Sequence, residues 1–209
     1  MNILGVFYSP KKTIIDAMNK PSLGLSVVLV LAPAVLALIG NLVYGMKIDF
    51  VNFILLLISL LVVWLAFSLV LMFLGYVFGV REKKRHFAGV ASSFALVKVL
   101  SSAFVIVMML FIPLTVSGKL LDLTKQLNQG ELGTNEFAVQ FAAELQQNPN
   151  SINLLPLVVF ALIAFALFIL SLYMYYVIVR EFTEFTGGKA FIVWLILIAL
   201  MLFFSPTLI

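Results

Sequence analysis

Long uninterrupted apolar stretches, rather than alternating apolar and polar positions, dominate this chain. No charged residue occurs between Lys20 and Lys47, and none occurs between Asp49 and Arg81. A helix needs roughly 20 apolar residues to cross a bilayer core about 30 Å thick. The continuous runs of Leu, Val, Ile and Phe therefore predict transmembrane helices and argue against a membrane β-barrel, whose strands alternate in polarity.

Five stretches meet this length requirement. The predicted spans are residues 22–44, 50–78, 87–116, 153–179 and 190–208. The second stretch is long enough for its helix to tilt in the bilayer. We therefore expect an all-α polytopic membrane protein, with five transmembrane helices in a single membrane domain over residues 1–209.

Composition supports the membrane class and narrows the function. Of the 209 residues, 64% are hydrophobic and 11% are charged, whereas soluble domains run at about 45–50% apolar and about 25% charged. The chain has no Cys and one His, His86, which excludes a disulfide framework, a thiol nucleophile and any metal site that needs two histidines. Because the spans also lack paired carboxylates, we expect no enzymatic activity and no cofactor.

The basic residues predict the orientation. One side of the predicted bundle carries nine: Lys11, Lys12, Lys20, Arg81, Lys83, Lys84, Arg85, Arg180 and Lys189. The other side carries three: Lys47, Lys119 and Lys125. Cytoplasmic loops are enriched in Lys and Arg, so the N-terminus is expected in the cytoplasm and the C-terminus outside. The expected location is the cell membrane, or the endoplasmic reticulum or Golgi membrane in a eukaryote.

The longest loop, residues 117–152, falls on the outer side. Apolar residues recur in it at helical spacing, first in Leu120, Leu123 and Leu127 and then in Phe137, Phe141 and Leu145. Thr134 is expected to cap the second helix, with Glu136 in its first turn. We expect two amphipathic helices that lie on the membrane or cap the bundle; the alternative is a substrate lid or a docking surface.

A dense basic run is the first candidate site. Arg81, Lys83, Lys84 and Arg85 fall in the cytoplasmic loop between the second and third spans. Such a run determines topology, and it can also bind anionic headgroups at about 1 kcal/mol per basic residue. An acidic partner protein is the third interpretation. The sequence indicates no nucleic-acid binding; the expected partners are lipid, another membrane protein or a second copy of the chain.

Lys98 is the second candidate, since it is the one ionisable residue well inside a predicted span. A charge near the bilayer centre costs about 2.5–3.5 kcal/mol on insertion scales. Its side chain can snorkel toward the inner interface or pair within the bundle, and the alternative is a polar functional site. Small residues at four-residue spacing before Lys98 predict close helix packing. The alternative is a polar cavity lined by Ser92, Ser93, Lys98 and Ser101, as in a small transporter or channel.

Three parts of the chain carry a resemblance to a known family. They are the N-terminal segment Phe7-Tyr8-Ser9-Pro10-Lys11-Lys12-Thr13, the small-residue start of the third span after Gly79-Val80-Arg81, and the last loop ending in Gly188-Lys189-Ala190. In these features the chain resembles the Yip1 family of five-span membrane proteins. The resemblance implies a five-helix bundle without enzymatic activity. Its eukaryotic members are associated with endoplasmic reticulum and Golgi trafficking, Rab-type GTPases and membrane shaping.

Residues 1–21 are shorter than the cytosolic region of the eukaryotic members, and their Asp-Leu-Tyr-Gly-Pro motif has no match here. The chain therefore resembles the short bacterial and archaeal members. The resulting hypothesis is a non-enzymatic membrane scaffold or adaptor, or a protein that organises the membrane or serves trafficking.

Overall fold

The fold is helical throughout the part of the chain that the structure describes. The computed structural model describes residues 2–78, 86–185 and 187–204. Within these ranges no strand forms, and an isolated antiparallel bridge joins Val116 to Ile152. The predicted all-α class is confirmed.

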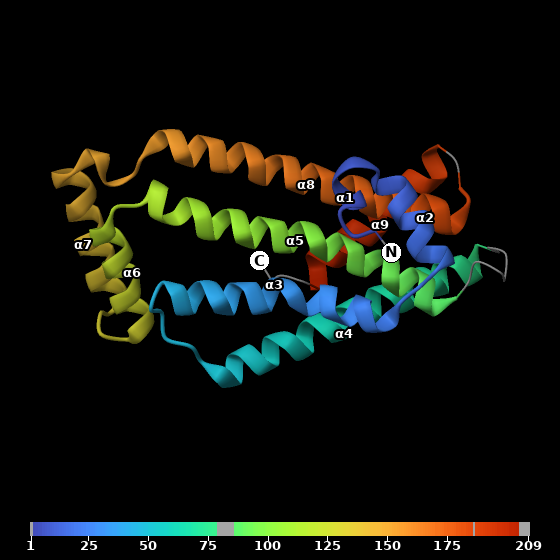
Figure 1. Cartoon of the computed structure of the whole chain (residues 1–209), viewed down its shortest axis with the longest axis horizontal. Helices are drawn as coiled ribbons and strands as arrows, with labels where there is room; N and C mark the ends of the chain where they lie inside the picture. The colour runs from blue at the N-terminus through green and yellow to red at the C-terminus, as the bar shows by residue number, and fades with distance from the viewer. Residues whose placement is uncertain (1, 79–85, 186, 205–209) are drawn as a thin grey trace.

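Four long apolar helices form the body of the molecule. They are α3 (Leu23–Val43), α4 (Phe50–Val77), α5 (Phe87–Thr115) and α8 (Leu154–Thr183). Each is long and apolar enough to cross a membrane. They run lengthwise along the long axis of the molecule (Figure 1). Their bounds agree closely with the first four predicted spans, except that α8 continues four residues past the predicted end at Val179.

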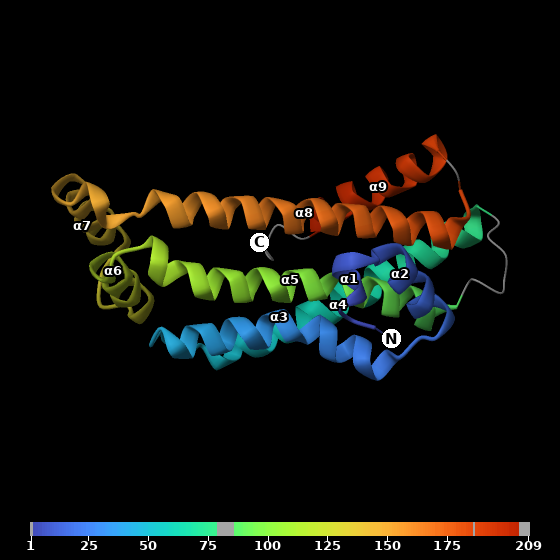
Figure 2. The same cartoon turned by 45° about the horizontal axis from the view of Figure 1, so that its top comes forward.

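Shorter helices occupy the two ends and one side of this body. They are α1 (Gly5–Tyr8), α2 (Pro10–Asn19), α6 (Gly118–Gln129), α7 (Thr134–Gln147), the 3-10 turn η2 (Pro149–Ser151) and α9 (Gly188–Phe204). Helices α6 and α7 lie at one end of the bundle, whereas α1 and α2 lie toward the other (Figures 1 and 2). The two predicted helices of the 117–152 loop are thus present, and they cap one end of the bundle.

Polar side chains begin several of these helices. Asp49 accepts hydrogen bonds from the N–H groups of Val51 (3.0 Å) and Asn52 (3.2 Å) at the start of α4. Asn153 accepts a hydrogen bond from the N–H of Leu155 at the start of α8. Such caps satisfy N–H groups that have no partner inside the helix. The expectation that Thr134 caps α7 is wrong: Gly133 is the cap residue, and its N–H donates to Glu136 Oε2 at 3.2 Å.

Helix α5 is the centre of the bundle. It packs mainly against α3 and α8, and also against α2 and α4. Every residue from Gly89 to Val97 is buried. The small side chains in this segment allow close approach: a Cβ added at Gly89 would lie 2.8 Å from the carbonyl oxygen of Met18. Helices in lipid commonly associate by close backbone approach at small residues, because burial of apolar surface contributes little to their association there.

Large apolar side chains cover the outside of the four long helices. Phe73 of α4 is 66% exposed, Leu162 of α8 is 65% exposed and Leu110 of α5 is 62% exposed. A soluble protein of this size rarely shows apolar patches of this extent. Contact with acyl chains instead of water removes the free-energy cost of exposing these side chains. The apolar outer face therefore agrees with an integral membrane protein.

Helix α9 is shorter than the other apolar helices, with 17 residues. It starts beside the end of α8 and runs back along it (Figure 2). The indole Nε1–H of Trp194 donates to the carbonyl oxygen of Leu172 at 3.1 Å, and its ring meets Tyr176 edge-on. The fifth predicted span, residues 190–208, thus begins as a helix packed on α8, but it remains a prediction as a membrane span.

Candidate functional site

The two ends of the bundle differ in charge. The end that holds α2, the end of α8 and the start of α9 carries, among described residues, Lys11, Lys12, Lys20, Arg180 and Lys189 against Asp16, Glu181 and Glu184. The opposite end carries Lys47, Lys119 and Lys125 against Asp49, Asp122, Glu131, Glu136 and Glu144. We call these the basic end and the acidic end. Bases exceed acids at the first, and acids exceed bases at the second.

The basic run between α4 and α5 is the strongest candidate from the sequence. Arg81, Lys83, Lys84 and Arg85 lie outside the described residues. The described residues next to them do lie at the basic end, where Phe78 follows the end of α4 and His86 precedes the start of α5. His86 has a structural task, because its Nδ1 accepts a hydrogen bond from the N–H of Gly89 at 3.1 Å.

Helix α2 brings further lysines to the basic end. One face of this helix is buried through Thr13, Ile14 and Ala17, which pack toward α5 and α8. Lys11 and Lys12 lie outside this buried face and are exposed. A helix with one apolar and one basic face is suited to a membrane interface. The sequence showed lysines before the first span, but it did not predict that their helix packs against the bundle.

An ion pair ties α2 to the end of α8. Lys11 Nζ lies 3.4 Å from Glu181 Oε1. The side chains are 52% and 21% exposed, so solvent screens the pair and it contributes little to stability. The contact places the Lys11 side chain along the last turns of α8. Since α8 was expected to end before Arg180, the sequence offered no signal for this contact.

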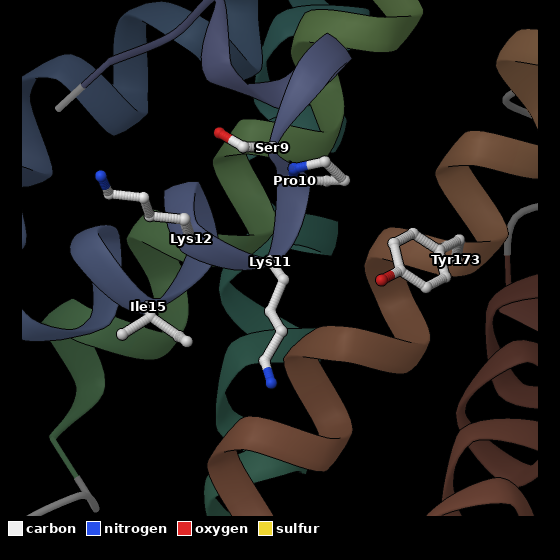
Figure 3. A pocket seen from close by; sticks show the side chains of 6 residues that line it. All are labelled: Ser9, Pro10, Lys11, Lys12, Ile15 and Tyr173. Carbon is white, nitrogen blue, oxygen red and sulfur yellow. The ribbon is translucent and has the colours of Figure 1, made fainter.

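A cavity of about 360 Å³ opens between α2 and α8. It is lined by Ser9, Pro10, Lys11, Lys12, Ile15 and Tyr173. Figure 3 shows the Tyr173 hydroxyl directed toward α2 and Lys11 extending alongside α8. Lys12 leaves α2 on the other side of the helix axis. Most of the lining surface is apolar, and the Lys11 and Lys12 ammonium groups point in different directions. We call this cavity the α2–α8 pocket.

The intramembrane candidates fall into two groups. Ser92 and Ser93 are fully buried and hydrogen-bonded. Ser92 Oγ accepts from Ser26 Oγ at 3.0 Å and from the N–H of Ser22 at 3.2 Å. Ser93 Oγ donates to the carbonyl oxygen of Gly89 at 2.8 Å. The Ser92 bonds thus join α5 to the start of α3, whereas the Ser93 bond stays within α5.

Lys98 and Ser101 form the second group. Both are half-buried on α5, about one and a half to two and a half turns further from the basic end than the serine pair. Among described residues, no carboxylate lies within ion-pair distance of Lys98. A second cavity, of about 270 Å³, lies between α5 and α8 near the acidic end and is lined by apolar side chains and Thr115. Neither this cavity nor the α2–α8 pocket is lined by a member of the predicted Ser92, Ser93, Lys98 and Ser101 set.

A buried carboxylate at the acidic end was missed from the sequence. Glu144 of α7 is 4% exposed. Its Oε1 accepts from Asn148 Nδ2 (2.9 Å) and Ser151 Oγ (3.2 Å), and its Oε2 is ion-paired with Lys119 Nζ. The Lys119 ammonium lowers the pKa of Glu144 below its ordinary value, assisted by the two hydrogen bonds and opposed by burial. This cluster joins α7 to the start of α6 and to η2.

Metal-binding geometry is not found in the described ranges. Among residues 2–78, 86–185 and 187–204, no three His, Cys, Asp or Glu side chains come together in a way that could hold a metal ion. The basic end is therefore the strongest candidate site, because it combines a cluster of basic side chains with a cavity, the α2–α8 pocket. The chain matches no protein-family model, no curated protein and no solved structure.

Proposed function

We propose that this protein is a non-enzymatic multi-pass membrane protein of the Yip1 type that organises the bilayer as a scaffold or adaptor. Its basic end gathers anionic lipid in one leaflet. In this proposal the chain has five spans, the N-terminus lies in the cytoplasm and the C-terminus lies outside.

The charge difference between the two ends is the observation that supports the proposal. The described bases at the basic end are joined in sequence by Arg81, Lys83, Lys84 and Arg85, which connect α4 to α5. The cytoplasmic leaflet carries a negative surface potential that attracts such basic residues, at about 1 kcal/mol each. An end this rich in lysine and arginine, directly below an apolar bundle, favours contact with anionic headgroups.

The length of α9 is compatible with a fifth span. Its 17 residues correspond to about 26 Å of helix, at the short end of the range for a transmembrane helix. Its direction, back along α8 from the basic end (Figure 2), would place the C-terminus on the outer side.

The absence of cysteine makes the topology directly testable. Each introduced Cys is the only thiol in the chain. We expect Asn135→Cys, at the exposed start of α7, to react with a membrane-impermeant maleimide in intact cells. Asn19→Cys, at the end of α2, should react only after permeabilisation. A Cys appended after Ile209 reports on the fifth span, which is contradicted if that Cys reacts only after permeabilisation.

Lipid recruitment tests the function itself. The protein is extracted with its surrounding lipid in polymer nanodiscs, and the ratio of anionic to zwitterionic lipid is compared with that of the bulk membrane. We expect enrichment of anionic lipid by about twofold or more, and loss of it when Arg81, Lys83, Lys84 and Arg85 are all changed to Gln. As a matched control, Lys47, Lys119 and Lys125 at the acidic end are changed to Gln. Equal loss in both variants would contradict recruitment at the basic end.

A further inference from the structure

We propose that α1 and α2 form a re-entrant helix pair that enters the hydrocarbon of the bilayer from the basic end, where its exposed face contacts the acyl chains of one leaflet. The partner of this surface is lipid, and not a cytoplasmic protein. This inference deepens the proposed function and rests on it, because it gives a multi-pass protein that organises the bilayer an element that displaces acyl chains in one leaflet.

The contact between α2 and α8 sets the depth at which α2 starts. Helix α8 has 30 residues, Leu154–Thr183, so its midpoint falls next to Phe168. When this midpoint is placed at the bilayer centre, Tyr173 lies about 7 Å from the centre, at about 1.5 Å per residue. Ser9 and Pro10 line the same cavity as Tyr173, so they lie near this depth. The start of α2 is thus well inside a hydrocarbon layer whose half-thickness is about 15 Å.

The contact between α2 and α5 sets the depth of the other end of α2. Helix α5 has 29 residues, and Gly89 lies near its start, about 18 Å from the helix midpoint. Met18 lies at this level, because a Cβ added at Gly89 would be 2.8 Å from the Met18 carbonyl oxygen. The two depth scales agree: the rings of Phe94 and Tyr175, with centroids 5.9 Å apart, both come out at about 10 Å from the centre. The rise of about 12 Å between Pro10 and Met18 matches a helix that runs from headgroup level into the hydrocarbon.

Helix α1 folds back on α2 at the inserted end. Figures 1 and 2, which share their horizontal axis, place α1 nearer to the middle of the bundle than α2. In the turn between the two helices, the Ser9 N–H donates to the carbonyl oxygen of Gly5 at 2.8 Å. The Ser9 carbonyl oxygen accepts from the N–H and from the hydroxyl of Thr13, both at 3.1 Å, and Pro10 has no N–H to satisfy. Backbone groups at this depth need such partners, because the hydrocarbon offers none.

The exposed face of the helix pair is apolar at its inserted end. Residues 2–10 contain no charged side chain. Leu4 and Tyr8 are each 68% exposed and Phe7 is 45% exposed, and the Tyr8 hydroxyl is paired with Asn2 Nδ2. The long helices expose apolar side chains in the same way. Water would make this face costly and acyl chains would not, so acyl chains are the occupant that fits both its chemistry and its depth.

The two lysines in the first turn of α2 differ in how they fit this depth. Lys11 extends alongside α8 (Figure 3) and pairs with Glu181, whose backbone lies about 19 Å from the bilayer centre. This is the snorkelling expected of a lysine whose helix enters the hydrocarbon. Lys12 has no carboxylate within ion-pair distance among the described residues, so its charge opposes insertion. Insertion thus depends on the two side chains with opposite sign.

Spin-label depth measurements on the full chain in proteoliposomes test the insertion. The chain has no Cys, so single labels are attached at Tyr8→Cys, Ile15→Cys and Asn19→Cys. The readout is the ratio of collision rates with oxygen, which concentrates in hydrocarbon, and with a water-soluble nickel chelate. We expect the ratio at Tyr8 to approach that of a reference label at Phe168→Cys, to exceed that at Asn19 several-fold, and to bracket an intermediate value at Ile15. Equal ratios at all three positions, as for a helix lying flat on the surface or in the cytoplasm, would overturn the proposal.

Two charge variants should shift the depth in opposite directions. Lys12→Leu removes the charge that opposes insertion, so the ratio at Tyr8 should rise. Glu181→Gln leaves Lys11 without its anion, so Lys11 is drawn toward water and the ratio at Tyr8 should fall. Lys20→Leu is the matched control, because Lys20 follows α2 at headgroup level, and it should leave the ratio unchanged. No change in either charge variant, or an equal change in the control, would overturn the proposal.

The reference label assigns a failure to the right hypothesis. If Phe168→Cys is shielded from the nickel chelate but Tyr8→Cys is not, the re-entrant pair is overturned and the proposed function stands. If Phe168→Cys is itself open to the chelate, the multi-pass bundle is contradicted and both proposals are overturned. Neutralising the basic run between α4 and α5 should remove the enrichment of anionic lipid and leave the ratio at Tyr8 unchanged. A fall of that ratio in this variant would overturn insertion as a property of the helix pair itself.

Discussion

The indole Nε1–H of Trp64 in α4 donates a hydrogen bond to the carbonyl oxygen of Ala91 in α5, with a distance of 2.8 Å between nitrogen and oxygen. Both residues are buried. The bond is possible because the helices approach closely at the small residues of α5. In lipid, where burial of apolar groups drives little association, such polar contacts between helices carry specificity.

Trp64→Phe should destabilise the bundle. The variant removes the hydrogen bond to Ala91 while keeping an aromatic ring in the core. Hydrogen bonds between membrane helices average about 0.6 kcal/mol and reach about 1.7 kcal/mol, so we expect a loss in this range, measured as reversible unfolding in mixed micelles by circular dichroism. Trp194→Phe is the comparison, because its bond joins α9 to α8. An unchanged unfolding free energy for Trp64→Phe would contradict a structural role of this bond.

Gly75→Ala should weaken the contact between α4 and α8. A Cβ at Gly75 would lie 2.5 Å from Cε1 of Phe182, which is buried. Overpacking of this kind typically costs about 1–3 kcal/mol, read from the same unfolding measurement. Gly24→Ala is the control, since a Cβ there meets nothing within 4 Å. The double variant Gly75→Ala/Phe182→Leu should recover part of the loss, and no recovery would argue against the clash.

Lys98→Leu should stabilise the protein. Lys98 lies within α5 and has no ionic partner among the described residues, so its charge is a cost of about 2.5–3.5 kcal/mol if it sits near the bilayer centre. Snorkelling reduces this cost and therefore the gain. The measurement is the unfolding free energy, together with solute flux in proteoliposomes. A strong loss of stability, or of a flux present in the unmodified protein, would instead support the polar site around Lys98.

The contact between Glu144 and Lys119 predicts a pH dependence of the acidic end. Because the pKa of Glu144 is lowered in the folded protein, the ionised carboxylate stabilises the junction of α6 and α7. This contribution is complete above the ordinary glutamate pKa of about 4.3 and is lost as the pH falls through the lower folded value. A spin label at Val139→Cys, on the exposed face of α7, should become more mobile below about pH 4.

Two glutamate variants serve as controls for this prediction. Glu144→Gln should give a mobile label already at neutral pH, because it leaves the Lys119 ammonium without its anion. Glu131→Gln, at an exposed position outside the cluster, should keep the unmodified pH profile. A mobility that depends on pH equally in the unmodified chain and in Glu144→Gln would contradict the role of Glu144.

Most of the helical framework could be predicted from the sequence. The four long helices agree with their apolar stretches because helix formation in a bilayer depends on the transfer free energy of one segment at a time. Asp49 and Asn153 mark helix starts for an equally local reason, since they bond N–H groups within three residues of themselves. The separation of the basic from the acidic loops was also visible, because successive spans alternate in direction.

The partners of individual side chains were not predictable in this way. Lys11 meets Glu181, and Tyr173 completes a pocket whose other walls come from α2. Glu144 lies in a segment that the sequence predicts only as an amphipathic helix, and the structure buries it against Lys119. Each of these relationships joins segments that are distant in sequence or connected through a turn of the chain. The sequence by itself determined which segments are helical and which ends are basic, because these properties are local. Only the tertiary structure decided which side chains share a pocket or an ion pair, because this depends on how the helices pack.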